Sequence, residues 1–226
     1  REDPTCHDRG TFVYLRDTAD GRVWSAGYQP VCAEPSRYDV AFHEDRVRIV
    51  RQDGTIETTL EIIVSAEDDA EIRRVTLRNL GTRASEIEIT SYAEITLAPP
   101  AADLSHPAFS NLFVRSEFVP QVSGLVFSRR PRLSTDRALH AAHVIATEAA
   151  TGLEFESDRA RFLGRGRTGR APLGVSEGGL RSRFGAFAAA LVVLAVLVPS
   201  SRDLWLRLHG QRDGRARVLG RHHHRH

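Results

Sequence analysis

The stretch from Tyr14 to Pro30 combines aromatic rings, an adjacent Arg–Asp pair and an amide side chain. Sugar rings bind proteins by stacking their C–H faces on aromatic side chains, while planar polar groups hold their hydroxyls. This mixture of side chains therefore indicates a saccharide-binding surface. Its candidate carbohydrate-binding residues are Arg16, Asp17, Trp24, Tyr28 and Gln29.

A structural interpretation of the same residues stays open. Tyr14 and Trp24 are equally suited to a hydrophobic core, where aromatic rings bury a large area. Arg16 and Asp17 would then form a structural ion pair. Further along, a loop over residues 99–107 interrupts the strands, and long ordered loops tend to carry function. Its Asp103 and His106 complete the set of candidate carbohydrate-binding residues.

The remaining motifs predict no metal or cofactor site. Clustered histidines such as His222–His226 bind metals in some proteins, but a solvated tail is the simpler interpretation here. Cys6 and Cys32 are the only cysteines, and we interpret them as unpaired thiols of a reducing compartment. The glycines at 164, 166 and 169 match half of a dinucleotide fingerprint, but the βαβ context that the fingerprint needs is missing.

Apolar and polar residues alternate with a period of two over much of the first 170 residues, as in half-buried strands. In Thr55–Ser65 the apolar residues share one face, with Ile63 as the exception. Asp53-Gly54 just before it is a strong hairpin signal, because a type I′ turn needs positive φ at both central positions. Further strands are predicted over residues 46–52, 71–80, 112–119, 125–128 and 143–147.

The longest alternation covers Ser85–Leu97. It predicts a strand with Ile87, Ile89, Ile95 and Leu97 on the buried face and the intervening residues in water. Helical periodicity is weak before residue 171. The sequence therefore predicts an all-β fold, an antiparallel β-sandwich over residues 11–163.

Charge divides the chain into an acidic body and a basic tail. Residues 1–170 hold 22 Arg and 26 acidic residues, whereas residues 171–226 hold 9 Arg and 3 acidic residues. An acidic body argues against nucleic acid as a partner, because phosphate binding needs a basic face. The tail includes the apolar run 184–198, shorter than the roughly 20 residues of a membrane span. We expect the tail to pack poorly on the sandwich, with one isolated helix over this run.

Six ordered motifs resemble the cyclic β-1,2-glucan synthetases, over roughly residues 8–170. The resemblance is to the N-terminal β-supersandwich domain of their glycoside hydrolase family 94 module, which cellobiose phosphorylases share. The motifs are YLRDTADGRVWS (14–25), EIRRVTLRN (71–79), TSYAEITLAP (90–99), DLSHPAFSNLF (103–113), RRPR (129–132) and SDRARFLGRGR (157–167).

The resemblance implies an incomplete antiparallel β-supersandwich over residues 8–170 and a non-homologous, low-complexity tail over residues 171–226. A reading-frame change is our preferred explanation of the tail, and a membrane-associated extension is the alternative. In the family a catalytic (α/α)₆ barrel follows the sandwich, where an Asp acts as general acid and inorganic phosphate attacks with inversion. The resemblance also implies a parent protein at the cytoplasmic face of the inner membrane. Because no barrel is visible, we expect this chain alone to be inactive.

Together these observations favour a carbohydrate-binding and scaffolding domain of a glucan-processing glycosyltransferase or phosphorylase. Its expected partners are a β-glucan and the catalytic barrel of the parent protein, with membrane association as a further expectation for residues 184–198. Two alternatives stay open, a stand-alone carbohydrate-binding module and a membrane-anchored structural domain.

Overall fold

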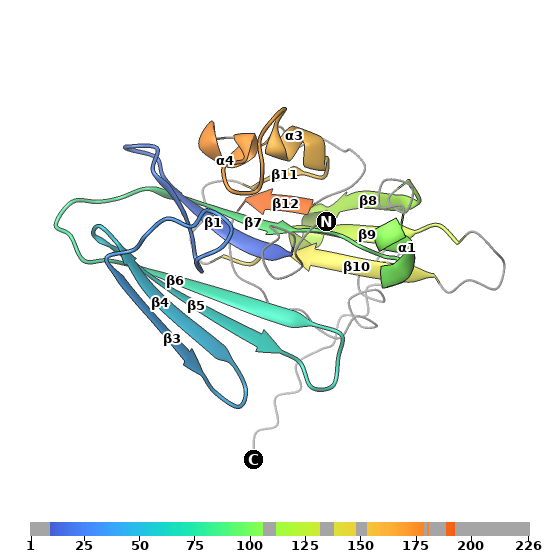
Figure 1. Ribbon diagram of the computed structural model, residues 1–226, viewed down its shortest axis with the longest axis horizontal. Coiled ribbons are helices and arrows are strands. Elements are labelled where there is room, and N and C mark those ends of the chain that lie inside the picture. The colour runs from blue at the N-terminus through green and yellow to red at the C-terminus, as the bar shows by residue number, and fades with distance from the viewer. Residues whose placement is uncertain are drawn as a thin grey trace, which may run out of the picture.

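The computed structural model describes residues 10–105, 112–131, 138–147, 153–178, 180 and 189–192. In this part of the chain the strands form three antiparallel sheets, and the helices are short (Figure 1). The predicted all-β fold is confirmed. At the start of β5, for example, Ile56, Thr58 and Leu60 are buried, whereas the two residues between them are partly exposed.

Sheet A has the strand order β11-β12-β7-β1-β2, sheet B the order β3-β4-β5-β6 and sheet C the order β10-β9-β8. The strands of sheet A are β1 (Thr11–Asp17), β2 (Val23–Ser25), β7 (Ile87–Ala93), β11 (Glu154–Glu156) and β12 (Ala189–Val192). Those of sheet B are β3 (Arg37–Phe42), β4 (Val47–Asp53), β5 (Ile56–Val64) and β6 (Glu71–Asn79). Those of sheet C are β8 (Val114–Val119), β9 (Gly124–Arg129) and β10 (Leu139–Val144).

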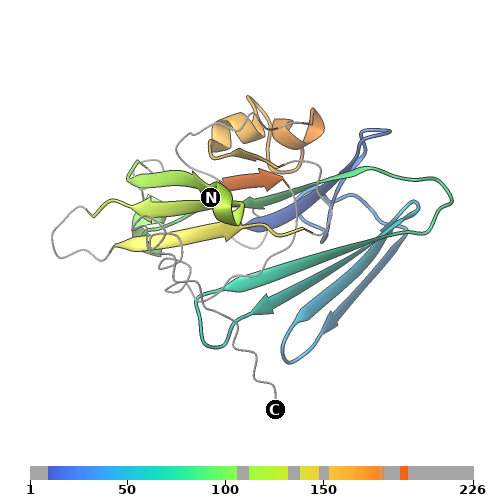
Figure 2. The same cartoon turned by 180° about the vertical axis from the view of Figure 1, so that it is seen from behind.

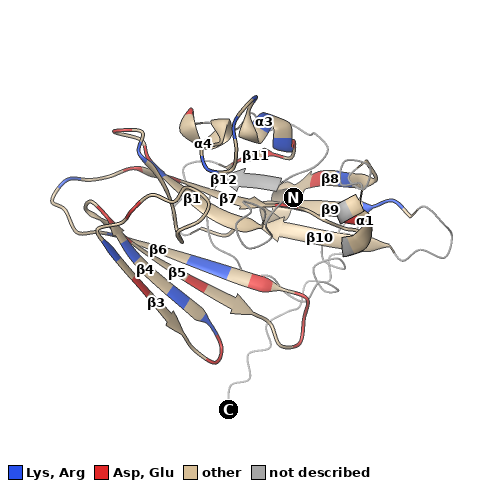
Figure 3. Cartoon of the chain, in the orientation of Figure 1, with Lys and Arg blue, Asp and Glu red and all other residues tan. Residues whose placement is uncertain are grey.

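Sheets A and B enclose the main hydrophobic core. Leu15 of β1, Ile89 of β7 and Leu60 of β5 meet there, together with Trp24 of β2. The strand register places Arg48, Glu57 and Glu61 on the opposite face of sheet B, and Arg and acidic residues recur along its strands (Figure 3). On that face Arg74 of β6 donates to Glu61 of β5. One face of sheet B is therefore apolar and packs in the core, whereas the other face is charged, as the period of two predicts.

The β4–β5 hairpin confirms the predicted strand pair and moves its turn by one residue. Asp53 is the last residue of β4 and lies opposite Ile56, so the two loop residues are Gly54 and Thr55. Gly54 has a φ of 62°, a value that glycine adopts at no steric cost. Asp53 remains in the strand, where its carboxylate accepts two hydrogen bonds from the guanidinium of Arg51.

Two short helices, α3 (Arg159–Leu163) and α4 (Leu173–Ser176), cover the face of sheet A that lies away from sheet B (Figures 1 and 2). Asp158 caps α3, because its side chain accepts from the backbone N–H groups of Ala160 and Arg161. Phe162 of α3 stacks on Tyr92 of β7, with 4.8 Å between the ring centroids.

This helical cap corrects the prediction that the second face of β7 is in water. Thr90 and Tyr92, which we assigned to the wet face, are buried. Ile89 is buried in the main core and Ile87 packs against it, as predicted. The strand ends at Ala93, and Ile95 and Leu97 instead pack on a third core formed around sheet C. Periodicity within β7 could not reveal a cap that helices α3 and α4 supply from a distant part of the chain.

The expected poor packing of the tail is wrong for its first residues. Val175 and Leu180 are buried in the cluster with Tyr14, Tyr92 and Phe162. Within the apolar run, residues 189–192 form strand β12, which pairs with both β7 and β11, and not the isolated helix that we expected. An apolar run of small and β-branched residues also suits a strand that is buried in a sheet.

Candidate functional site

The loop over residues 26–36 is held from beneath by the buried guanidinium of Arg51. Arg51 donates to the carbonyl oxygens of Gly27 and Ala33, near the two ends of this loop. Its remaining donors bind both carboxylate oxygens of Asp53, each at 2.7 Å. Such a planar fork of donors gives bidentate pairing and fixed geometry. Arg51 therefore fixes the position of the loop relative to sheet B.

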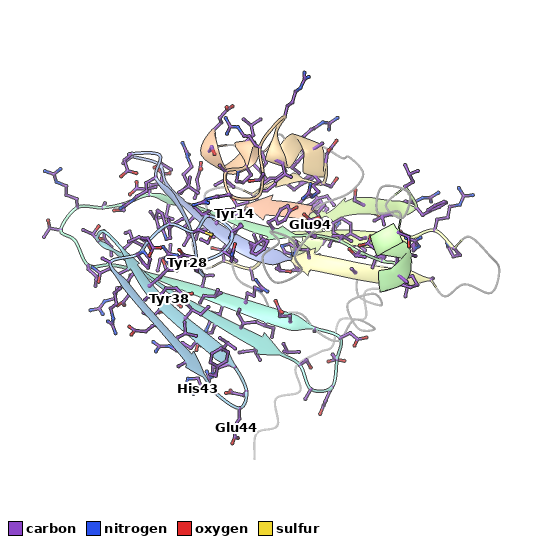
Figure 4. All side chains as sticks on the ribbon, viewed as in Figure 1. Tyr14, Tyr28, Tyr38, His43, Glu44 and Glu94 are labelled. Carbon is purple, nitrogen blue, oxygen red and sulfur yellow. The ribbon has the colours of Figure 1, made fainter. Side chains whose placement is uncertain are left out.

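The loop presents Tyr28 and Gln29 to solvent beside Tyr38 of β3 (Figure 4). Tyr28 is 36% exposed, and its ring meets the Tyr38 ring edge to face, with 6.2 Å between centroids. The Tyr28 hydroxyl donates to Glu34 Oε1 at 2.6 Å. We call these four residues, Tyr28, Gln29, Glu34 and Tyr38, the tyrosine platform. It offers aromatic faces with an amide and a carboxylate beside them.

The electrostatics of the platform follow from its hydrogen bonds. The hydrogen bond to Glu34 raises the pKa of Tyr28, because it is made by the protonated hydroxyl. The positive charge of Arg170 acts on the same pKa in the opposite direction. Burial raises the pKa of Tyr38. Both tyrosines therefore keep their hydroxyl protons at neutral pH, available as hydrogen-bond donors.

Trp24 is a core residue. Its side chain is 1% exposed and lies in the main core between sheets A and B, with the guanidinium of Arg22 5.4 Å from the ring centroid. It offers no exposed ring to a sugar in this structure. The sequence could not separate an exposed from a buried Trp, because both suit a strand of alternating pattern.

Arg16 and Asp17 do not form a joint polar surface, because neighbouring strand residues point to opposite faces. Arg16 binds Glu88 across the sheet at 2.7 Å, and a Cβ at Gly178 would lie 2.8 Å from its guanidinium. Asp17 ends β1 and accepts a hydrogen bond at 2.9 Å from the backbone N–H of Ala19. Each side chain has a local structural role.

The second candidate stretch is described only in part. Asp103 lies in α1 (Pro100–Ser105), the helix within the loop where no helix was expected, and its side chain is partly exposed. His106 lies outside the described residues. Of the six candidates that the structure describes, only Tyr28 and Gln29 lie together on one exposed surface.

Two sets of polar contacts were not predicted from the sequence. Glu94 accepts from Arg159 at 2.7 Å and from Tyr92 at 2.5 Å, which ties helix α3 to sheet A. The Ser91 hydroxyl lies 2.9 Å from Nε2 of His143, between sheet A and sheet C. Ser91 and His143 are 52 positions apart in the sequence, and Glu94 and Arg159 are 65 apart. No local spacing could have indicated these two contacts.

The described part of the chain also bears on metal binding and on membrane contact. There, no three His, Cys, Asp or Glu side chains are grouped so as to hold a metal ion. The helices described are all too short or too polar to cross a bilayer. Cys32 has a free thiol, partly buried next to Gln29.

Comparison with known proteins identifies the family. The model of the glycosyl hydrolase 94 supersandwich domain matches residues 1–199. The chain belongs to this supersandwich family. The matched range continues past Arg170, where we expected the resemblance to end.

Three relatives are similar over parts of their length. The cyclic β-(1,2)-glucan synthase NdvB of Rhizobium meliloti (strain 1021) is 36% identical over 98% of this chain and 8% of its own. The solabiose phosphorylase of Paenibacillus borealis is 34% identical over 38% of this chain and 11% of its own. The N,N'-diacetylchitobiose phosphorylase of Vibrio furnissii is 25% identical over 75% of this chain and 21% of its own. The supersandwich chain thus spans a small part of each relative.

Proposed function

We propose that this chain is the supersandwich portion of a larger glucan-processing protein of the cyclic β-(1,2)-glucan type. In that protein it would contact the saccharide and support a separate catalytic domain. The observation that carries the proposal is the tyrosine platform, held on a supersandwich that is 36% identical to a cyclic β-(1,2)-glucan synthase over 98% of this chain. The parent's activity and substrate come from that likeness.

The platform is suited to a glucan by its chemistry. An exposed tyrosine ring offers an apolar face for the C–H side of a glucosyl unit, and Gln29 and Glu34 offer donors and acceptors for its hydroxyls. Because Arg51 fixes the loop from below, little backbone entropy remains to be lost on binding. A saccharide surface of this kind binds without carrying out chemistry.

Catalysis is assigned to the parent's barrel. Glu61, Glu88 and Glu94 each bind an arginine within the fold, which favours structural roles for these carboxylates. We expect the purified chain to release no glucose 1-phosphate from β-glucan and phosphate. Measurable release by the purified chain would overturn this assignment.

We also propose that the parent lies at the cytoplasmic face of the inner membrane. The apolar composition of residues 184–198 supports a membrane contact, whereas the pairing of residues 189–192 in sheet A competes with it. Flotation of the chain with anionic lipid vesicles tests the membrane contact on which this proposal rests. Chain left entirely at the bottom of the gradient would contradict it.

Binding of β-1,2-linked glucan oligosaccharides, measured by calorimetry, tests the saccharide proposal. Tyr28→Ala removes the ring and should weaken binding about 2- to 10-fold, the range of one aromatic contact. Tyr28→Phe keeps the ring and should bind more tightly than Tyr28→Ala. The matched control is Val64→Ala, an exposed apolar residue at the far end of β5. Equal affinities of all variants, or no binding at all, would refute the platform as the site.

A further inference from the structure

Strand β3 is an unprotected edge of sheet B. All six of its residues are exposed, and among the described residues no strand pairs with it on the side away from β4. Edge strands present unpaired N–H and C=O groups that can accept another strand. Natural edges are usually blocked by proline, bulges or inward charges. Between Arg37 and Phe42, β3 has no proline, and its two charged residues bind each other at 2.6 Å.

The direction of the unpaired backbone groups follows from the hairpin. His43 donates its backbone N–H to Arg46 at the turn, and antiparallel pairs alternate between hydrogen-bonded and non-hydrogen-bonded. Asp39 and Ala41 therefore belong to pairs that bond to β4. The backbone groups of Tyr38, Val40 and Phe42 point away from β4, toward the free edge.

The side chains of these same three residues form an exposed apolar row. Tyr38, Val40 and Phe42 lie on the face of sheet B that carries the main core, beyond the part that sheet A covers. Phe42 is 80% exposed. The free edge and the uncovered apolar row thus coincide on one strand.

We propose that β3 pairs with β3 of a second copy of this chain, antiparallel and centred on Val40. The row has an aromatic residue on each side of Val40. A two-fold axis at Val40 therefore places each aromatic residue opposite an aromatic residue of the partner subunit. Tyr38 then lies opposite Phe42 of the partner subunit, and Val40 lies opposite Val40 of the partner subunit. All three outward-facing residues fall in hydrogen-bonded pairs, and aromatic cross-strand pairs are among the stabilising ones.

The charge of Asp39 favours this register over the one that is centred on Asp39. In the centred register Asp39 lies opposite Ala41 of the partner subunit, and no like charges are directly opposed. A shift by two residues would place Asp39 opposite Asp39 of the partner subunit, which is destabilising. It would also leave Phe42 without a hydrogen-bonded partner. The pairing joins two four-stranded sheets into one continuous sheet, and it does not depend on saccharide binding.

Sedimentation velocity of the full chain over a micromolar concentration series tests the proposal. The wild-type chain should form a dimer whose fraction rises with concentration. Val40→Lys places a charge at the centre of the pairing and should give a monomer with unchanged circular dichroism. Val64→Lys, a matched change at an apolar residue that is 68% exposed on the same sheet face, should leave the dimer intact. A monomer at every concentration, or a dimer that Val40→Lys does not weaken, overturns the proposal.

Cross-linking tests the register in chains with Cys6→Ser and Cys32→Ser. Chains with Asp39→Cys are mixed with chains carrying Ala41→Cys and oxidised with a copper catalyst. The paired Cα atoms should lie about 4.5 Å apart, within reach of a disulfide. Mixed dimers should therefore form faster than dimers of the Asp39→Cys chain alone. Equal rates would refute the centred register.

Discussion

The Ser91 hydroxyl and the His143 ring lie 2.9 Å apart, although they belong to different sheets. Burial of the ring, together with the positive charge of Arg73, lowers the pKa of His143 to about 4. Nε2 of the neutral imidazole can then accept a hydrogen bond from the serine hydroxyl. The pair joins sheet A to sheet C in the neutral form of the histidine.

The lowered pKa of His143 predicts that stability falls in mild acid. In the unfolded chain His143 binds a proton below its ordinary pKa of about 6.5, whereas in the folded chain it stays neutral down to about pH 4. The free energy of unfolding should therefore decrease by about 1.4 kcal/mol per pH unit across this window and level off below it. Urea unfolding at a series of pH values measures the slope. His143→Gln should remove this contribution, whereas His43→Gln, at an exposed turn, should leave it unchanged.

Trp24→Ala should destabilise the fold by roughly 3–5 kcal/mol, because it leaves a cavity in the core between sheets A and B. Chemical unfolding measures the loss. Tyr28→Ala, at an exposed ring, is the matched control and should cost much less. If Trp24→Ala kept its stability and lost only glucan affinity, the ring would be a contact residue after all.

Arg51→Ala should cost roughly 3–5 kcal/mol, the range for breaking a buried ion pair. The substitution leaves the Asp53 carboxylate buried without its partner and frees the carbonyls of Gly27 and Ala33. The double variant Arg51→Met with Asp53→Leu should be less destabilised, because neither charge is then left unpaired. A double variant that is less stable than Arg51→Ala would contradict this explanation.

Glu34→Ala should lower the pKa of Tyr28 toward the ordinary value near 10, since the hydrogen bond to Glu34 is the main cause of its increase. Tyrosinate absorbance during an alkaline titration measures the change, and the Tyr28→Phe chain identifies which transition belongs to Tyr28. An unchanged Tyr28 titration would mean that the hydrogen bond is absent in solution.

The sequence by itself determined the class of fold and several of its strands. The alternation over residues 56–64 and 71–79 could only bury its apolar side in a sheet, so β5 and β6 follow from local chemistry. The family, too, could be read from ordered motifs such as residues 14–25 and 157–167. Such signals lie within a single segment, where the period of the side chains is visible.

Tertiary structure alone decided which polar and aromatic residues are available. Trp24 and Tyr28 lie four positions apart, yet one fills the core and the other is exposed, because sheet B covers the first and a loop held by Arg51 displays the second. The burial of Tyr92 depends on Phe162, and the low pKa of His143 depends on a neighbouring sheet. The burial and the pKa of a side chain depend on the segments that pack against it in the folded chain. Contacts between segments that are distant in the sequence leave no periodic pattern in it.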